Sequence, residues 1–199
     1  MSISNTFFRF VFAFSFFFIS FALIAEPTLE EVVVSARKVD ESVQDVPIAM
    51  SVFTSSDISD AGIERPEDFI ALTPNVVMAN TVNVGDTLVT IRGLTSTRDA
   101  ESNFAFVVDG VLQTNPNAFN RELLDIAQIE VLKGPQGALY GRNATSGAIL
   151  ITTKAPSEES ESTAVIGMGV NNASKLQYVN SGKMGDNVYT RFSVSTRET

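Results

Sequence analysis

Residues 129–154 read IEVLKGPQGALYGRNATSGAILITTK, and this stretch decides the fold. It contains two apolar runs, Ile129–Leu132 and Ala148–Thr153, whose β-branched residues are typical of strands at the centre of a sheet. The segment between them is rich in glycine, which permits tight turns and a close approach of the backbone to its neighbours. A phosphate-binding loop is a poor alternative, because neither Gly-Lys-Ser/Thr nor Gly-x-Gly-x-x-Gly occurs in it.

Upstream of this stretch, short strands and short helices alternate. Ile48–Phe53 alternates as a strand, and Thr54–Asp57 supplies cap residues for a short helix that ends at Gly62. Arg65–Leu72 is expected to form a second short helix with a proline in its first turn. The pattern predicts an α+β domain over residues 46–156, built on a small mixed β-sheet with short helices. The other expected elements are strands at Val76–Ala79, Leu88–Arg92, Phe104–Val108 and Val111–Leu112, a tight Asp109-Gly110 turn between the last two, and a helical turn at Glu122–Ala127.

Downstream, residues 157–199 have a different texture. A polar break at Ser157–Ser162 precedes three β-runs, Thr163–Val170, Leu176–Lys183 and Val188–Arg197, with no helical pattern between them. In the last run apolar and polar residues interleave, as they do weakly in transmembrane barrel strands of about 10 residues. An ordinary β-meander on a soluble domain explains these residues alone slightly better, so both interpretations stay open at this point.

The N-terminal residues predict export. Phe10–Ile24 is an apolar run of 15 residues with Arg9 before it, which is short for a membrane-spanning helix of roughly 20 residues. Residues 1–25 therefore have the layout of a secretory signal peptide, cleaved after Ala22 or Ala25, with an uncleaved anchor as the alternative. Residues 26–45 are polar and charged, and we expect them to form a mobile periplasmic arm that stays outside any core.

Composition excludes several classes of function. The formal net charge is −9, which suits neither nucleic acid nor an anionic membrane surface. Histidine is absent, and with it the commonest metal ligand and general base. Cysteine is absent too, so no disulfide forms and no thiol can act as a nucleophile. We expect no catalytic residues, no metal site and no cofactor, and hence no enzyme.

Several segments, taken in order over about residues 30 to 197, resemble the TonB-dependent outer-membrane receptors. Any one of them is a weak signal, but their ordered recurrence over more than 100 residues is specific. Asn75 stands where the family has glycine in its Pro-Gly-Val turn. The segments that carry the resemblance are Glu30–Ala36, which is similar to the TonB box; Val46–Val52, similar to the entry strand of the plug domain; and the plug motifs Leu72–Val76, Ile91–Gly93, Val108–Val111, Ile129–Pro135, Ala138–Arg142, Gly147–Ile149 and Ile151–Lys154.

The resemblance implies two sets of functional residues. A TonB box adds itself as a strand to the edge of the periplasmic protein TonB, which needs an extended, β-prone stretch. The alternative is that this stretch is an edge strand of the plug itself. Arg92 and Arg142 correspond to family arginines that meet glutamates on the inner wall of the barrel, whereas Asp109 is better explained as a turn former. The residues expected to contact TonB are Glu30, Glu31, Val32, Val33, Val34, Ser35 and Ala36.

An intact receptor of this kind resembles a barrel of about 22 strands whose lumen the plug closes. Residues 157–199 suffice for about three strands of roughly 10 residues each, an incomplete antiparallel start of a transmembrane β-barrel. We therefore expect the plug and TonB-contacting portion of an outer-membrane active transporter of a Gram-negative bacterium. Its partners would be TonB, the outer membrane, its own barrel and a scarce ligand, by family default a ferric siderophore. The alternative is a stand-alone periplasmic binding module, which would be the case if the chain ends at residue 199.

Overall fold

The computed structural model describes residues 31–80, 87–96, 101–169 and 173–198. Val32–Thr199 forms one compact unit, and the following description concerns the described residues of that unit alone. The expected signal peptide at residues 1–25 lies outside the described residues, as does Glu30. Within the described ranges, no helix has the length and apolar character needed to cross a membrane.

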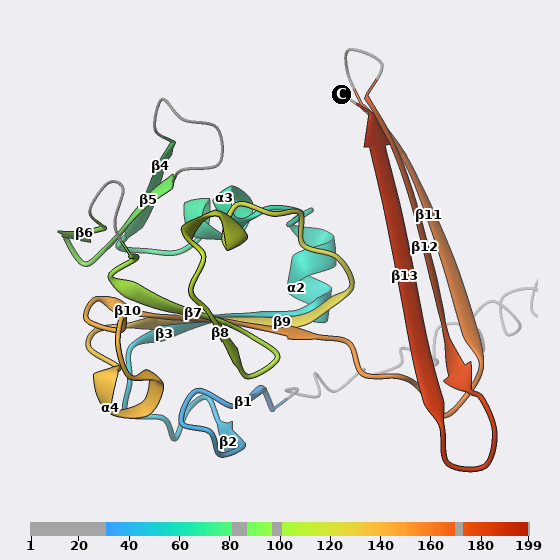
Figure 1. The fold of residues 1–199 in the computed structure, drawn as a ribbon, viewed down its shortest axis with the longest axis horizontal. Helices are drawn as coiled ribbons and strands as arrows, with labels where there is room; N and C mark the ends of the chain where they lie inside the picture. The colour runs from blue at the N-terminus through green and yellow to red at the C-terminus, as the bar shows by residue number, and fades with distance from the viewer. Residues whose placement is uncertain (1–30, 81–86, 97–100, 170–172, 199) are drawn as a thin grey trace, which may run out of the picture. The chain divides into compact units, whose positions relative to one another are not determined.

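The central element is a mixed five-stranded sheet (Figure 1). Strands β9 (Ile126–Lys133) and β10 (Gly147–Thr153) lie side by side and antiparallel at its middle. They contain the two apolar runs of the deciding stretch, so the prediction of central strands is confirmed. β10 also pairs in parallel with β7 (Phe104–Val108), which makes the sheet mixed. The strand order is β3-β9-β10-β7-β8, where β3 spans Met50–Thr54 and β8 spans Val111–Gln113.

The helices form where local capping and proline favour them. Helix α2 (Ser55–Asp60) begins after Thr54, whose side chain accepts a hydrogen bond from the backbone of Asp57 in a capping box. Helix α3 (Pro66–Ala71) has its proline at the first helical position, where no N–H is needed. Both were predicted. A third short helix, α4 (Gly137–Tyr140), and the 3₁₀ turn η1 (Pro116–Ala118) were not.

The two faces of the sheet are covered by different elements, because side chains alternate along each strand. In Figure 1, helices α2 and α3 lie over one face, and α4 lies on the other face with the short strands β1 (Val33–Val34) and β2 (Glu41–Ser42). Each face has its own hydrophobic cluster. The first contains Phe69, Val89, Ile91, Phe104, Phe119, Ile129, Val131 and Ile149; the second contains Val34, Ala36, Ala105, Val107, Leu132, Ala144, Ala148 and Leu150.

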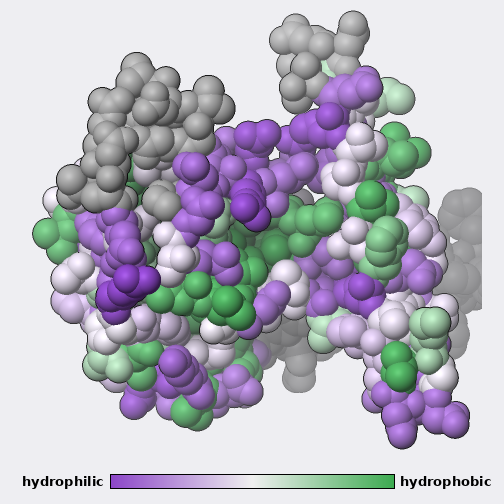
Figure 2. All heavy atoms as spheres, viewed as in Figure 1, coloured by the Kyte–Doolittle hydropathy of each residue, from purple (hydrophilic) through white to green (hydrophobic). Residues whose placement is uncertain are grey.

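Two smaller sheets complete the described residues. Strands β4 (Val76–Asn80), β5 (Thr87–Ile91) and β6 (Leu94–Thr95) form one antiparallel sheet. Strands β11 (Glu161–Met168), β12 (Ser174–Lys183) and β13 (Tyr189–Glu198) form another, whose exposed hydrophobic residues are seen in green in Figure 2. These elements confirm the predicted α+β fold and the antiparallel strands that follow it.

One predicted element is wrong. Glu122–Ala127 forms no helical turn, and its last two residues begin β9. The reason is tertiary pairing: the amide of Leu123 donates to the carbonyl of Glu64 at 2.7 Å, and Ile126 lies opposite Thr153 of β10. These contacts come from segments distant in the sequence, so the local pattern could not reveal them.

Candidate functional site: the docking surface for residues 33–36

The segment that resembles a TonB box folds back into a small hairpin. Val33 lies opposite Ser42, and Val34 lies opposite Glu41, in the antiparallel pair of β1 and β2. The turn between these strands is closed by the amide of Lys38, which donates to the carbonyl of Ser35 at 2.8 Å. The segment is therefore extended, as strand addition requires, but it is paired within its own chain.

Alternation within the hairpin buries every second side chain. Val34 is 1% exposed and Ala36 is fully buried, both in the second hydrophobic cluster, whereas Val33 is 48% exposed. The expectation that residues 26–45 stay outside any core is therefore wrong for Val34 and Ala36. The physical reason is that the apolar face of the sheet around Leu132 needs a cover, and the small side chains of this segment supply it.

Two side chains of β9 bind the backbone of the segment. The Glu130 carboxylate accepts through Oε1 from the Ser35 amide at 3.1 Å and from the Ser35 hydroxyl at 3.3 Å. The Gln128 amide group donates to the carbonyl of Val33 at 3.0 Å and to Oε1 of Glu130 at 3.4 Å. Tyr140 of α4 adds a third contact, since its hydroxyl donates to the carbonyl of Ala36 at 2.8 Å. We call Gln128, Glu130 and Tyr140 the docking residues.

Glu130 is an ionisable residue in a buried position that disfavours its charged form. The residue is 2% exposed, and its Oε2 has no hydrogen-bond partner among the described residues. Burial raises the pKa of Glu130 above its usual value; the hydrogen bonds from Ser35 act in the opposite direction, and the charge of Asp40 adds to the rise. A buried oxygen without a hydrogen-bond partner costs free energy, so Glu130 binds the segment at a desolvation cost to the folded plug.

Tyr140 is half-buried between the segment and the sheet. Burial, with a contribution from the charge of Glu130, raises its pKa to about 12, so the phenol remains a hydrogen-bond donor at neutral pH. The Lys38 ammonium lies 5.7 Å from the centre of the Tyr140 ring, which is within the range of a cation–π contact. The arrangement can hold a short segment through a few weak contacts; nothing in it resembles a catalytic pair.

The docking residues were not predicted as a site. Glu130 and Lys133, which are close in the sequence, lie on opposite faces of β9 and do not pair with each other. Glu130 faces Ser35, whereas the Lys133 ammonium donates to the Ser51 hydroxyl at 3.0 Å. Burial lowers the pKa of Lys133, and the charge of Arg92 lowers it further. Only the odd spacing of the two residues in a strand could have indicated this separation.

The two expected plug–barrel arginines lie exposed in different loops. Arg92 has a positive φ of 50° in the turn after β5, and its guanidinium packs where a side chain on Gly134 would stand, 3.1 Å from that position. Arg142 follows α4 and forms an exposed ion pair with Glu101 at 3.3 Å. Exposed pairs contribute little to stability, so Arg142 can exchange this partner at low cost.

The comparison with known proteins decides the family. Residues 42–148 match the model of the TonB-dependent Receptor Plug Domain. The chain belongs to this family. The family is one of receptor plugs and not of enzymes, and relatives such as the ferrichrome outer membrane transporter of Escherichia coli are outer-membrane receptors of Gram-negative bacteria.

Relatives of this plug are receptors of different ligands. The chain is 31% identical to the pesticin receptor of Yersinia enterocolitica over 132 residues, which are 66% of this chain and 19% of that protein. It is 28% identical over 174 residues to a vitamin B12 transporter of Vibrio vulnificus, covering 84% of this chain and 28% of the relative. The chain thus spans less than a third of the curated relatives that it matches.

Solved structures share the fold. The ferric yersiniabactin uptake receptor of Yersinia pestis superposes with a TM-score of 0.66 at 27% identity, over 74% of this chain and 24% of that receptor. The ferripyoverdine receptor of Pseudomonas aeruginosa gives a TM-score of 0.72 at 19% identity, over 83% and 22% of the two chains. At that identity the second likeness shows the fold alone.

Proposed function

We propose that the chain is the plug and TonB-contacting portion of an outer-membrane active transporter, and that it gates TonB-energised uptake of a ferric siderophore. In this proposal residues 33–36 leave the docking residues, and residues 30–36 add as a strand to TonB. The observation that carries it is the way the segment is held: two short paired strands and a few side-chain contacts attach it to the plug, outside the five-stranded sheet. Such a segment can detach without breaking the main sheet.

The proposal also takes β11, β12 and β13 as the first strands of the barrel. Side chains alternate in burial along β12 and β13, and the more exposed face of the three strands carries large apolar residues. Arg92 and Arg142, both exposed on the plug, would then meet glutamates on the inner barrel wall. The apolar residues on the exposed face are Ile166, Met168, Leu176, Tyr178, Phe192 and Val194.

The ligand class rests on the relatives. The structural relative with 27% identity is named for uptake of ferric yersiniabactin, and another relative for ferrichrome. Vitamin B12 transporters are the rival, since one of them matches over 84% of this chain. Competition between a labelled ferric siderophore and cyanocobalamin for uptake through the receptor tests this point. Uptake of cobalamin alone would overturn the siderophore assignment and leave the TonB step intact.

The TonB step is tested at Val33. Val33→Pro removes a backbone amide and restricts φ, so strand addition to TonB fails and energised uptake is lost. The matched control, Val33→Ala, keeps the amide and alters only a half-exposed side chain, so uptake stays within about twofold of the parent. Surface binding of ligand in de-energised cells is expected to be unchanged in both. Full uptake by Val33→Pro would contradict the proposal.

A further inference from the structure

We propose that Asp125 and Arg191 form a positioning pair that fixes the start of β9 against the first barrel strands. The polarity of this contact is the reverse of that expected for Arg92 and Arg142: the plug supplies the carboxylate and the strand supplies the cation. This inference rests on the proposed function in one respect, namely that β11, β12 and β13 belong to the barrel.

The pair is bidentate and well buried. Nε of Arg191 donates to Oδ2 of Asp125 at 2.5 Å, and a terminal nitrogen of the same guanidinium donates to Oδ1 at 2.8 Å. The two side chains are 13% and 9% exposed, far less than in the Arg142–Glu101 pair. A two-point contact of this kind fixes the orientation of both groups, which a single exposed ion pair does not.

Asp125 is built for this position. It directly precedes β9 and has a φ of 57°, a left-handed conformation that a non-glycine residue adopts at some cost. Its carbonyl accepts from the amide of Lys154, the residue after β10, at 2.9 Å. The backbone of Asp125 therefore closes one end of the central strand pair while its side chain points to β13.

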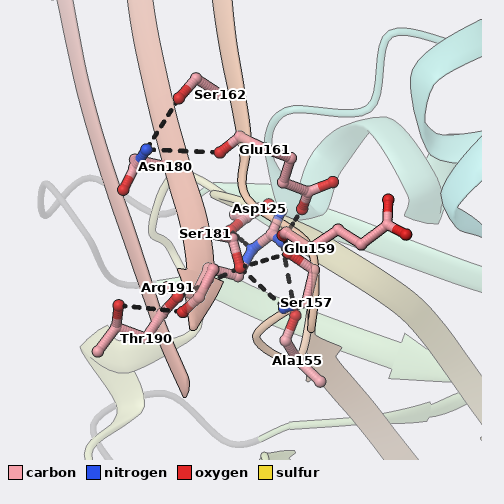
Figure 3. A network of polar contacts seen from close by, with 11 residues as sticks. Asp125, Ala155, Ser157, Glu159, Glu161, Ser162, Asn180, Ser181, Thr190 and Arg191 are labelled. Atoms are coloured by element: carbon pink, nitrogen blue, oxygen red, sulfur yellow. Dashed lines mark hydrogen bonds and ion pairs between the residues drawn. The ribbon is translucent and has the colours of Figure 1, made fainter. Parts of the chain in front are cut away.

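Arg191 and its neighbours extend the contact into the segment that joins the plug to the strands (Figure 3). Another guanidinium nitrogen of Arg191 donates to Glu161 at 2.7 Å, at the start of β11. Nearby, the amide of Ser157 donates to the hydroxyl of the buried Ser181 at 2.8 Å. The connection that leads from the plug to β11 is thus held at Ser157 and at Glu161 by side chains of the three-stranded sheet.

Other pairs with the same polarity surround this centre. Glu64 of the plug accepts from Lys175 of β12 at 2.7 Å and also binds Arg197 of β13. Glu122 lies 3.6 Å from Arg197. The plug carboxylates therefore meet a row of strand cations, and Asp125–Arg191 is the least exposed of these pairs. Loss of Arg191 leaves the Asp125 carboxylate without its cation, whereas loss of Asp125 leaves Arg191 its contact with Glu161.

Through β9, the Asp125–Arg191 pair is linked to the docking residues. Asp125 stands three residues before Gln128 and five before Glu130 of β9, and both of those side chains bind residues 33–36. A fixed start of β9 gives the docked segment a support that does not move when the segment is pulled away. Asp125 and Arg191 are positioning residues in this sense; neither touches residues 33–36.

The test uses the full chain in outer-membrane vesicles and exploits its lack of cysteine. Gln177 of β12 lines a cavity of about 380 Å³ together with Asp125 and Arg191, so Gln177→Cys reports the separation of the plug from the strands. Asp125→Asn and Arg191→Gln are each expected to raise its maleimide labelling rate by about tenfold or more. The double variant removes both charges and is expected to be labelled no faster than the faster single variant, because no buried charge is left unpaired.

Two controls make the result decisive. Glu67→Gln removes a plug carboxylate from an exposed pair with Arg65 and should leave the labelling rate unchanged. Ala118→Cys, buried in the first hydrophobic cluster, should stay protected in every variant. If Ala118→Cys were labelled as fast as Gln177→Cys, the plug would be unfolding. If the increases in labelling rate of the two single variants multiplied in the double variant, Asp125 and Arg191 would act independently. Either result would contradict the proposal that they form a positioning pair.

A separate measurement tests the barrel assignment on which the proposed function depends. Protease protection of β11, β12 and β13 in the parent vesicles measures their membrane insertion before any variant is compared. Strands that are not inserted contradict the barrel assignment, while the labelling cycle at Asp125 and Arg191 still decides whether the two side chains position each other.

Discussion

At the scale of single residues, Glu130 carries the strongest constraint on the docked segment. Because burial raises the pKa of Glu130 above its value in the unfolded chain, the folded plug binds a proton at Glu130 more readily than the unfolded chain does. The stability that this contributes is therefore fully present below the ordinary value of 4.5 and is lost as the pH rises through the raised pKa. The free energy of unfolding should fall over that window by at most about 1.4 kcal/mol per pH unit, the limit for one proton.

Glu130→Gln is expected to abolish this pH dependence. The glutamine oxygen still accepts from the Ser35 amide, but it has no charge to titrate. The measurement is the free energy of unfolding in urea of parent and variant between pH 4.5 and 7. A free energy of unfolding that falls with pH equally in parent and variant would show that another group controls this pH dependence.

The sequence indicated some of these residues and not others. The Asp109-Gly110 turn was predictable because its chemistry is local: both residues have positive φ, and the Asp109 carboxylate also accepts from the Thr153 amide at 2.8 Å. The role of Glu130 was not predictable, because its partner Ser35 lies 95 residues away in the chain. The same holds for Tyr140, whose partner Ala36 is 104 residues away.

At the scale of elements, the pairing of β9 with β10 depends on the absence of a side chain at Gly147. A Cβ at this position would stand 2.2 Å from the Leu132 carbonyl and 3.2 Å from the Ile91 side chain. Gly147→Ala is expected to lower the free energy of unfolding by about 1–3 kcal/mol or more, because backbone on the partner strand must move. The urea midpoint of the full chain measures this change.

Gly137→Ala is the matched control for that substitution. Gly137 begins α4, and a Cβ there meets nothing within 4 Å. Alanine is favoured over glycine in a helix, so the variant should be neutral or more stable by up to about 1 kcal/mol. A Gly147→Ala midpoint equal to that of Gly137→Ala would mean that β9 and β10 adjust without cost, and the close approach would lose its importance.

Elements with a strong local signal were the predictable ones. Helices α2 and α3 follow from a capping box and an N-terminal proline, and the central strands follow from their apolar runs. The 126–127 segment was misassigned because its pairing with β10 overrides local propensity. The hairpin of β1 and β2 was missed for the same reason: with only two residues in each strand, it depends on the cluster around Leu132 rather than on its own pattern.

At the scale of the whole plug, the two hydrophobic clusters divide its stability into two parts. One cluster lies under α2 and α3 and contains most of the aromatic rings, and the other includes the segment proposed to bind TonB. A part held by few buried side chains opens at lower free energy than the main core. Detachment of residues 33–36 should therefore be possible while the five-stranded sheet remains folded.

Two substitutions separate these parts. Val34→Ala removes buried methyl groups from the second cluster, and exchange is expected to increase in residues 33–36, while the amides of β9 and β10 keep their protection. Phe69→Ala removes a fully buried ring that packs against Phe53 and Phe119, and should destabilise the whole plug by about 3–5 kcal/mol. Hydrogen exchange resolved by peptide distinguishes the two responses. If Val34→Ala increased exchange in β9 and β10 as much as in residues 33–36, the segment and the sheet would unfold as one unit, and TonB could not take the segment without unfolding the plug.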